Sequence, residues 1–225
     1  TDATGTLDFS GGIAGGYRLV EFAFDFTYAN TTLIDTAILP DTLVTIRNSA
    51  FQNAGNLHRL VCHAPNLSYI GTNAFRSAAI TNDASEAVPA GVGTLSTLAF
   101  KSLTGSLVLT NAVWIDYTFE GCTLTNLVID SPRLTSLKAL TVTTNLLSLR
   151  IASSVLTDYT TRLDGDKYLR SLSLDLPHVT SLVPYGLFRN LSGVTTDVGR
   201  IIGPQMENIT GTAMCFGSPF TGAVV

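Results

Sequence analysis

The feature that most constrains the fold is an internal repeat with a period near 23 residues. Prolines at positions 40, 65 and 89 lie 25 and 24 residues apart, and prolines 132 and 177 follow after 43 and 45 residues, close to two periods each. An apolar pattern of the form L-x-x-L-x-L keeps this register at residues 57–62, 124–129, 146–151 and 169–174. Strands that start at positions 33, 57, 81, 104, 124, 146 and 169 would succeed one another in steps of 24, 24, 23, 20, 22 and 23 residues. Because one such unit is too small to bury its own apolar face, the repeat predicts a solenoid.

A second motif supports the same register. Five units carry an apolar residue followed five positions later by phenylalanine: Ile46 to Phe51, Ile70 to Phe75, Leu95 to Phe100, Trp114 to Phe119 and Val183 to Phe188. We expect this segment, often Ala-Phe, to form a short helical turn with the phenylalanine inside the solenoid. Within each strand, we expect the first, fourth and sixth positions to point inward and the third, fifth and seventh to point to solvent.

Composition excludes several classes of protein. Only 13% of residues are charged and 45% are hydrophobic, so the chain has enough apolar surface to fold. The net charge is 13 − 17 = −4 and the basic residues are scattered, which argues against a nucleic-acid partner. No apolar run approaches the roughly 20 residues of a membrane span. With 31 Thr and 18 Ser, the polar surface is mostly hydroxyl.

Residues 40–51 read P-D-T-L-V-T-I-R-N-S-A-F, and residues 119–122 read F-E-G-C. This resembles the repeat of the BspA-like leucine-rich-repeat family, P-x-x-V-x-x-I-x-x-x-A-F, with its A-F-x-x-C continuation. The resemblance covers residues 33–202, with a degenerate repeat to Phe216. Several units place the proline eight rather than six residues after the strand start, the family's glycine appears only at Gly71, and Ala-Phe is lost near Val142 and Leu163.

The resemblance implies a β-rich α/β solenoid, a leucine-rich-repeat superhelix of about seven to eight repeats of 20–25 residues with one short parallel strand each. It also implies a secreted or cell-surface bacterial binding module, without catalysis, that mediates adhesion to an extracellular protein or glycan. We expect a monomer at the cell surface or outside the cell. The chain does not begin with methionine, and we expect a signal or anchor to lie outside this sequence.

The two flanks differ from the repeats. We expect residues 1–32 to form an N-terminal cap with one strand within residues 17–27, where Val20, Phe22, Phe24 and Phe26 share one side. Residues 33–216 then form the solenoid. Residues 217–225 lack a pattern and are expected to form a C-terminal tail.

No combination of residues indicates a catalytic centre, a metal site or a cofactor. His58 and Cys62 face one side of a strand and His63 the other, so they do not converge on an ion. The Asp164-Gly165-Asp166 segment lacks the other ligands of a calcium loop and fits a turn. The three cysteines, at positions 62, 122 and 215, are widely spaced, and we expect Cys62 and Cys122 to be reduced and buried.

The functional prediction therefore rests on the exposed strand face, where stacking aligns outward side chains in columns. One column runs through Asp35, Arg59, Asp83, Ser106, Asn126, Ser148 and Ser171, and the next through Ala37, Val61, Ser85, Val108, Val128, Arg150 and Ser173. A third runs through Leu39, His63, Ala87, Thr110, Asp130, Ala152 and Asp175. The candidate binding residues on this face are Asp35, Arg59, His63, Asp83, Asn126, Asp130 and Arg150.

Arg59 is the expected anchor, because a guanidinium pairs with carboxylates, stacks on aromatic rings and spans sugar hydroxyls. His63 would add pH dependence, and Arg59→Ala together with His63→Ala would weaken binding at least tenfold. Three alternatives stay open. The hydroxyl-rich face is a merely solvated surface, the chain is a structural spacer, or it is a polysaccharide-acting enzyme on a parallel β-helix.

Overall fold

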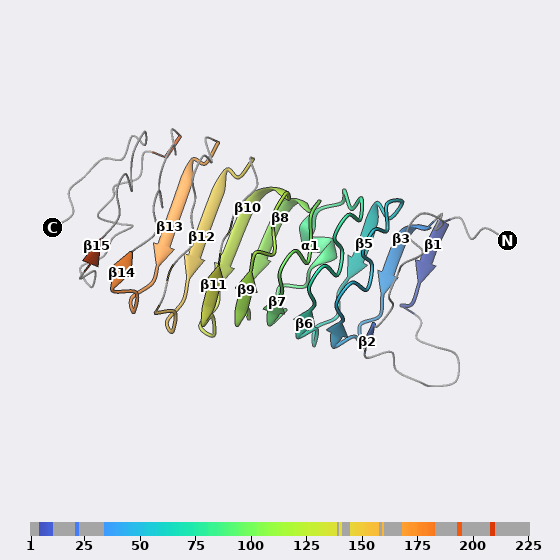
Figure 1. Cartoon of the computed structure of the whole chain (residues 1–225), viewed down its shortest axis with the longest axis horizontal. Helices are drawn as coiled ribbons and strands as arrows, with labels where there is room; N and C mark the ends of the chain where they lie inside the picture. The colour runs from blue at the N-terminus through green and yellow to red at the C-terminus, as the bar shows by residue number, and fades with distance from the viewer. Residues whose placement is uncertain are drawn as a thin grey trace.

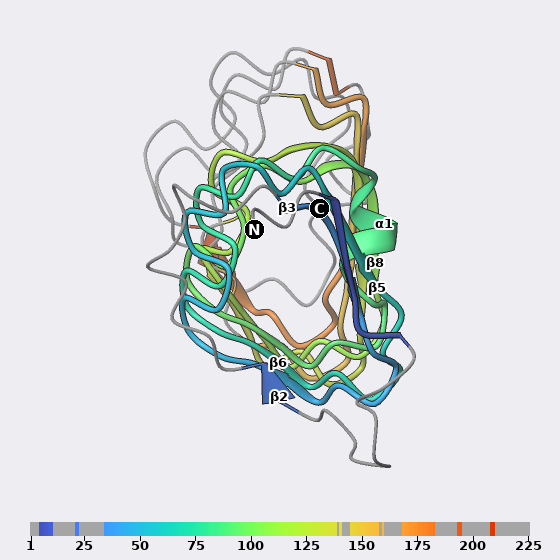
Figure 2. The ribbon, with the colours of Figure 1, turned by 90° about the vertical axis from the view of Figure 1, so that its right-hand side faces the viewer.

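The computed structural model describes residues 5–10, 21–22, 34–138, 140, 145–157, 159, 168–182, 193–194 and 208–209. Within these residues the chain winds into a β-solenoid whose coils follow one another along the long axis of the molecule (Figure 1). Seen along that axis, successive coils overlie one another and enclose a common interior (Figure 2). All pairings between the named strands are parallel, and neighbours within each sheet follow the order of the sequence.

One side of the solenoid, here called the long-strand wall, consists of two sheets. The first contains β1 (Gly5–Asp8), β3 (Ile34–Leu39) and β5 (Arg59–Cys62). The second contains β8 (Thr104–Leu109), β10 (Thr123–Asp130), β12 (Ser148–Ala152) and β13 (Ser171–Asp175). The four-residue helix α1 (Ala84–Ala87) lies between the two sheets, where a strand starting at position 81 was expected.

The next side, the short-strand wall, is a single sheet of six strands. Its members are β2 (Glu21–Phe22), β4 (Thr45–Ile46), β6 (Tyr69–Ile70), β7 (Thr94–Leu95), β9 (Trp114–Asp116) and β11 (Ser136–Lys138). A separate pair, β14 (Ser181–Leu182) and β15 (Asn208–Ile209), lies further along the chain. Coils therefore carry a long and a short strand, and the prediction of one strand per repeat is wrong because the apolar residue of the second motif lies on the short strand.

The third side is made of the Ala-Phe segments, which are turns and not the expected helical turns. The amides of Ser49, Phe51 and Asn53 donate to the carbonyls of the next coil, at Thr72, Ala74 and Arg76. Ser49 and Asn53 have φ angles of 58° and 62°, and Asn73 and Ser77 repeat this with 57° and 61°. The left-handed residues at the two ends of the turn direct alternate amides toward the neighbouring coil. In a helix these amides would instead donate to carbonyls of the helix itself.

Phenylalanine side chains fill the interior behind these turns, as predicted. The rings of Phe51 and Phe75 lie 4.9 Å apart and within 7° of parallel, and Phe75 and Phe100 repeat this at 5.0 Å and 5°. All three are at most 3% exposed. Large apolar rings at adjacent coils thus form a continuous stack in the core.

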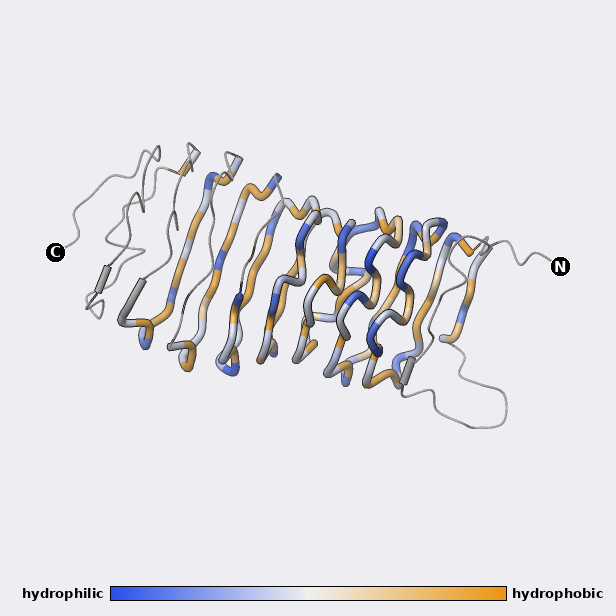
Figure 3. Tube along the Cα trace, in the orientation of Figure 1, coloured by the Kyte–Doolittle hydropathy of each residue, from blue (hydrophilic) through white to orange (hydrophobic). Residues whose placement is uncertain are grey.

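The interior of the long-strand wall is aliphatic. Inward positions of β10, β12 and β13 form two buried ladders, Leu127 with Leu149 and Leu172, and Ile129 with Ile151 and Leu174. The alternation of hydrophobic and hydrophilic positions along these strands is visible in Figure 3. It follows from the two-residue period of a strand with one face on the core.

Gly71 is required where two coils approach each other closely. A Cβ at this position would lie 2.5 Å from the backbone nitrogen of Asn48 and 2.7 Å from the carbonyl carbon of Arg47. The neighbouring backbone leaves no room for any side chain, which explains the glycine in the most regular repeat of the sequence.

The N-terminal segment contributes strands to both walls. β1 pairs with β3 on the long-strand wall, and β2 pairs with β4 on the short-strand wall. β1 was not predicted, and of the expected strand only residues 21–22 are described. A capping role for residues 1–32 remains a prediction, while Phe188, Phe216, Cys215 and residues 217–225 lie outside the described residues.

The α/β description of the fold is not supported, because α1 is the only helix in the part of the chain that the structure describes. The same residues contain no helix that is long and apolar enough to cross a membrane. The observed class is a β-solenoid.

Candidate functional site

The four-stranded half of the long-strand wall carries the predicted columns. Pairing between β8, β10, β12 and β13 places Ser106, Asn126, Ser148 and Ser171 in one row. The adjacent row contains Val108, Val128, Arg150 and Ser173, as the repeat register predicts. Hydroxyl, amide and guanidinium groups therefore line up across four successive coils on the outside of the molecule.

Three contacts link outward side chains of neighbouring strands. The side-chain amide of Asn126 donates to Ser106 Oγ at 3.0 Å. Arg150 donates from Nη2 and Nε to Asp130 Oδ2 at 3.3 and 3.4 Å, and from Nη1 to Ser173 Oγ at 3.4 Å. Arg150 thus bridges three strands, and its side chain remains 42% exposed.

The third row ends in a shallow depression. Asp130, Ala152 and Asp175 occupy equivalent positions at the carboxyl ends of β10, β12 and β13. Together with Pro132 and Pro177 they line a depression of about 350 Å³. The small Ala152 forms the floor between two carboxylates that are two strands apart, and with Arg150 beside them these charges sum to −1.

The three-stranded half departs from the predicted register by one residue. Arg59 pairs with Thr36 and not with Asp35, because Ala37 and Leu39 are the buried positions of β3. The strand phase therefore starts at Ile34 instead of position 33, and Ala37 and Leu39 leave the outward columns. The Asp35 carboxylate instead lies 2.8 Å from Nδ1 of His58, and His63 is exposed just after β5.

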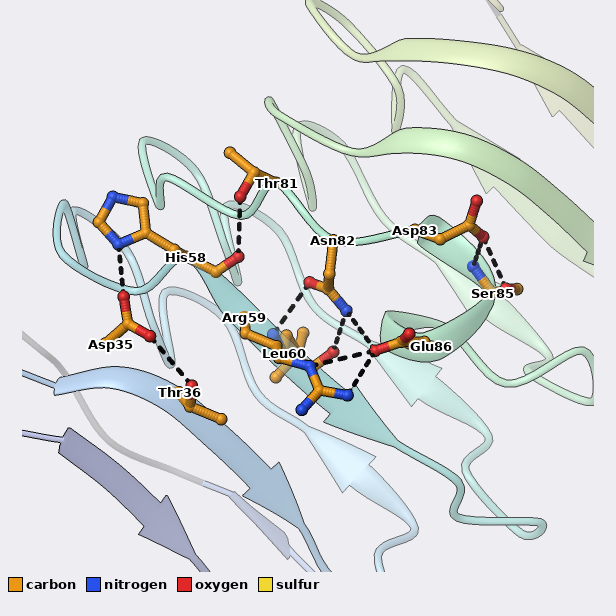
Figure 4. A network of polar contacts seen from close by, with 10 residues as sticks. All are labelled: Asp35, Thr36, His58, Arg59, Leu60, Thr81, Asn82, Asp83, Ser85 and Glu86. Carbon is orange, nitrogen blue, oxygen red and sulfur yellow. Dashed lines mark hydrogen bonds and ion pairs between the residues drawn. The ribbon is translucent and has the colours of Figure 1, made fainter.

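Asp83 is not on a strand; it caps α1. One oxygen of its carboxylate accepts from the hydroxyl and amide of Ser85 at 2.6 and 2.9 Å (Figure 4). The other oxygen accepts from the Ser106 amide at 3.1 Å. The hydrogen bonds from Ser85, first from its hydroxyl and then from its amide, lower the pKa of Asp83. Ser85 and Ala87 belong to the helix, so their predicted column positions are also wrong.

Asn82 closes the edge of β5 that the missing strand leaves open. Its amide accepts from the Leu60 backbone nitrogen at 3.1 Å and donates to the Leu60 carbonyl at 2.8 Å (Figure 4). A single side chain thus supplies the donor and the acceptor that a neighbouring strand would have supplied. On the other side of α1, the Asp83 carboxylate supplies an acceptor for the backbone amide of Ser106 on β8.

Arg59 belongs to this same network. Its Nη2 and Nε donate to Glu86 Oε2 at 3.0 and 3.3 Å, and Asn82 donates to the same oxygen at 3.2 Å. The hydrogen bonds from Arg59 and Asn82 lower the pKa of Glu86. The expected anchor of a binding face is therefore a partner of α1, and sequence reasoning missed Glu86 and Asn82.

The two described thiols are buried, as predicted. Cys62 and Cys122 are each 1% exposed and free. Burial raises the pKa of Cys62 to about 11 and that of Cys122 to about 12, so neither is a reactive thiolate. Among the described residues no group of three His, Cys, Asp or Glu side chains could hold a metal ion.

Comparison with known proteins identifies one family. A family model described as a BspA type leucine rich repeat region matches residues 22–144 in 6 copies. The match spans 123 of the 225 residues, more than half of the chain. No curated protein and no solved structure is similar enough to count as a match.

Proposed function

Because the chain belongs to the BspA-type leucine-rich-repeat family, we propose that it is the binding module of a secreted or cell-surface protein. Repeats of this type generally bind other molecules and do not catalyse reactions. The proposed role is adhesion to an extracellular protein or glycan through the outward face of β8, β10, β12 and β13.

The observation that carries this proposal is the register of the four strands, which is continuous from the Ser106–Asn126 pair onward, past an irregularity between Leu124 and Asn126. It aligns Asn126, Arg150 and Asp130 with the hydroxyls of Ser106, Ser148 and Ser171 on one surface. Such a surface offers many weak contacts in fixed positions, which suits multivalent adhesion. The depression between Asp130 and Asp175 adds a place for a cationic or hydroxyl-bearing group.

The other half of the wall is a poorer candidate surface. Asp35, Arg59 and Asp83 were proposed as binding residues, but each has a described intramolecular partner. The partners of Arg59 and Asp83 belong to α1, so a ligand that displaced them would release the helix, whereas Asn126, Asp130 and Arg150 contact only side chains of their own sheet. Of the seven candidate residues, we therefore propose Asn126, Asp130 and Arg150 on the four-stranded sheet as the binding residues and Asp35, Arg59 and Asp83 as structural ones, while His63 stays a candidate on the N-terminal coils.

A pair of matched variants tests the proposal. Val108, 44% exposed on β8, would be replaced by glutamate on the proposed face, and Val44, 37% exposed beside the short-strand wall, would be replaced in the same way. The recombinant chain is first screened against matrix proteins and a glycan array. We expect Val108→Glu to weaken any hit at least tenfold and Val44→Glu to leave it unchanged.

The opposite result would move the site off this face. Absence of any binding partner, together with normal assembly on the surface of the source cell, would favour the spacer role. Hydrolysis of a polysaccharide on the same array would favour the β-helix enzyme alternative.

A further inference from the structure

Two aromatic residues, the half-buried Tyr69 and the exposed Trp114, lie on the short-strand wall, away from the face proposed above. The strand register aligns one outward residue from each coil, in the order Thr45, Tyr69, Thr94, Trp114 and Ser136. The next residue of each strand points inward, and Ile46, Ile70, Leu95, Ile115 and Leu137 are all buried. The outward residues therefore form a column one side chain wide, which runs along the solenoid axis.

The two aromatic members of this column are held in place by neighbouring coils. The Tyr69 hydroxyl lies 3.2 Å from Asn48 Oδ1 on the preceding coil and donates to it. Trp114 is 41% exposed, and Lys138 Nζ lies 5.3 Å from the centroid of its ring. Neither aromatic ring needs to be ordered by a ligand, which lowers the entropic cost of binding.

The position between the two aromatic residues has a small side chain that carries a hydroxyl group. Thr94 lies there, half-buried, and the residue before it is Gly93, which has no side chain. A Cβ on Gly93 would already lie 3.0 Å from the Ser68 carbonyl oxygen, so the wall is closely packed at this point. A small hydroxyl residue thus lies between the two aromatic residues of the column.

The spacing of the aromatic residues identifies a ligand class. From β6 to β9 there are two interstrand steps, roughly 10 Å. In an extended β-1,4-linked polysaccharide, each pyranose ring advances by nearly the same step and is turned over relative to its neighbour. We propose that the short-strand wall binds such a chain laid along the solenoid axis, with Tyr69 and Trp114 stacking on alternate rings and Thr94 facing the ring between them.

The chemistry of the column agrees with this ligand. The C–H groups on a sugar face carry partial positive charge and are attracted to the negative face of an aromatic ring. The five side chains from Thr45 to Ser136 are uncharged, which matches an uncharged glucan or chitin chain. Lys138 Nζ lies over one face of the Trp114 ring, so the sugar would stack on the other face, and the ammonium group would be a donor for a sugar hydroxyl. A protein partner, by contrast, needs a contact of about 800 Å² per side, far wider than one column.

Retention on microcrystalline cellulose and on chitin beads tests the proposal directly. We expect the full chain to be retained on at least one of them, and Trp114→Ala and Tyr69→Ala each to lower the retained fraction at least tenfold. Trp114→Phe and Tyr69→Phe keep an aromatic face and should retain most of the binding. Tyr168→Ala is the matched control, because Tyr168 is also 41% exposed but lies outside this wall.

Competition with soluble sugars distinguishes recognition of an extended chain from non-specific adsorption. Cellohexaose, which is extended, should displace the chain, whereas the α-linked, curved maltohexaose should not. Three outcomes would overturn the proposal: both sugars displace the chain equally, Trp114→Ala is retained as well as the parent chain, or the parent chain is retained on neither solid. So would a protein ligand that is lost in Trp114→Ala while neither polysaccharide binds. The variants lie on a different wall from Val108, so failure here leaves the proposed function untouched.

Discussion

The two halves of the long-strand wall come from the same repeat, yet their polar side chains have different partners. In the N-terminal half, Asn82 and Asp83 hold α1 against the edges of β5 and β8, and Arg59 pairs with Glu86. In the four-stranded half, the sheet is continuous and its outward polar groups contact mainly one another. In the N-terminal half, polar side chains satisfy backbone groups where α1 interrupts the hydrogen-bond ladder of the sheet. In the four-stranded half, they lie on a continuous outward face.

This difference shows that a position in a repeat does not by itself define a binding residue. Arg59 and Arg150 both point outward from long strands, in different columns, and form comparable exposed ion pairs, with side-chain exposures of 52% and 42%. Arg59 is coupled to α1, because Glu86 and Asn82 belong to that segment, while Arg150 is coupled only to strands of its own sheet. The interruption at α1 thus separates a structural half from the candidate binding half.

The largest expected effect concerns the core behind the N-terminal half. Phe75 stacks on two rings, so Phe75→Ala should lower the free energy of unfolding by about 3–5 kcal/mol. Phe119→Ala is the control, because Phe119 is equally buried but lies outside this three-ring stack. Phe119→Ala should lower the free energy of unfolding less than Phe75→Ala does, by about 0.5–1.5 kcal/mol for each of the two ring contacts that Phe75 makes in the stack. Urea unfolding measures both free energies. If Phe75→Ala left the free energy of unfolding unchanged, the repeat register that puts Phe75 in the core would be wrong.

Thiol labelling can assign that destabilisation to one half. Cys62 lies in the same coil as Phe75, and Cys122 precedes β10 in the four-stranded half. In a Cys215→Ser background both thiols should react slowly, because both are buried and their pKa values are raised. Phe75→Ala should accelerate labelling of Cys62 more than that of Cys122, since a solenoid loses stability at the local interface. Equal acceleration of both thiols would indicate a single cooperative unit.

Much of this comparison could be predicted from the sequence, because the repeat fixes which residues are equivalent. The Phe51–Phe75 stack and the four-strand columns follow from spacing alone. The one-residue slip at Asp35 was not predictable from the leucine pattern, since Ile34, Ala37 and Leu39 satisfy the inward positions as well as the assumed set does. Left-handed backbone at Ser49 and Asn53 leaves no composition signal either.

The helix α1 was predictable in principle. The sequence Asp83-Ala-Ser-Glu86 has the spacing of a capping box, with an N-cap acceptor and glutamate three positions later. Alanine and glutamate also favour a helix over a strand. The repeat spacing favoured a strand at position 81, because strand starts at 57 and 104 leave room for one more start between them. This local helix signal was therefore not used.

The cap itself gives the next prediction. Asp83→Ala should cost about 0.5–2 kcal/mol of stability, because it removes the α1 cap and the acceptor for the Ser106 amide. Asp83→Asn keeps a capping oxygen and should cost less. Thermal unfolding of the two variants at neutral pH measures the difference, and equal losses would show that the charge matters more than the cap.

Acidification should weaken the same network. The pKa values of Asp83 and Glu86 are lowered in the folded state, so their stabilisation is present above the unfolded pKa values, about 4, and is lost as the pH falls through the folded values. In the parent chain, stability should therefore decline below about pH 4. A Glu86→Gln variant should show a shallower decline than the parent, and an identical pH profile would contradict the role assigned to the Arg59–Glu86 pair.

The smallest change in stability, and the sharpest test of the comparison, comes from the two arginines. Arg59→Ala and Arg150→Ala each break an exposed ion pair, so each should lower stability by less than about 1 kcal/mol. Their effects on binding should differ, because only Arg150 lies on the continuous sheet beside the depression. For any ligand that Val108→Glu displaces, Arg150→Ala should weaken affinity at least tenfold, while the Arg59→Ala, His63→Ala double variant should leave it within about twofold, a difference of more than about 1 kcal/mol. The reverse order would return the site to the N-terminal coils, as the sequence alone predicts.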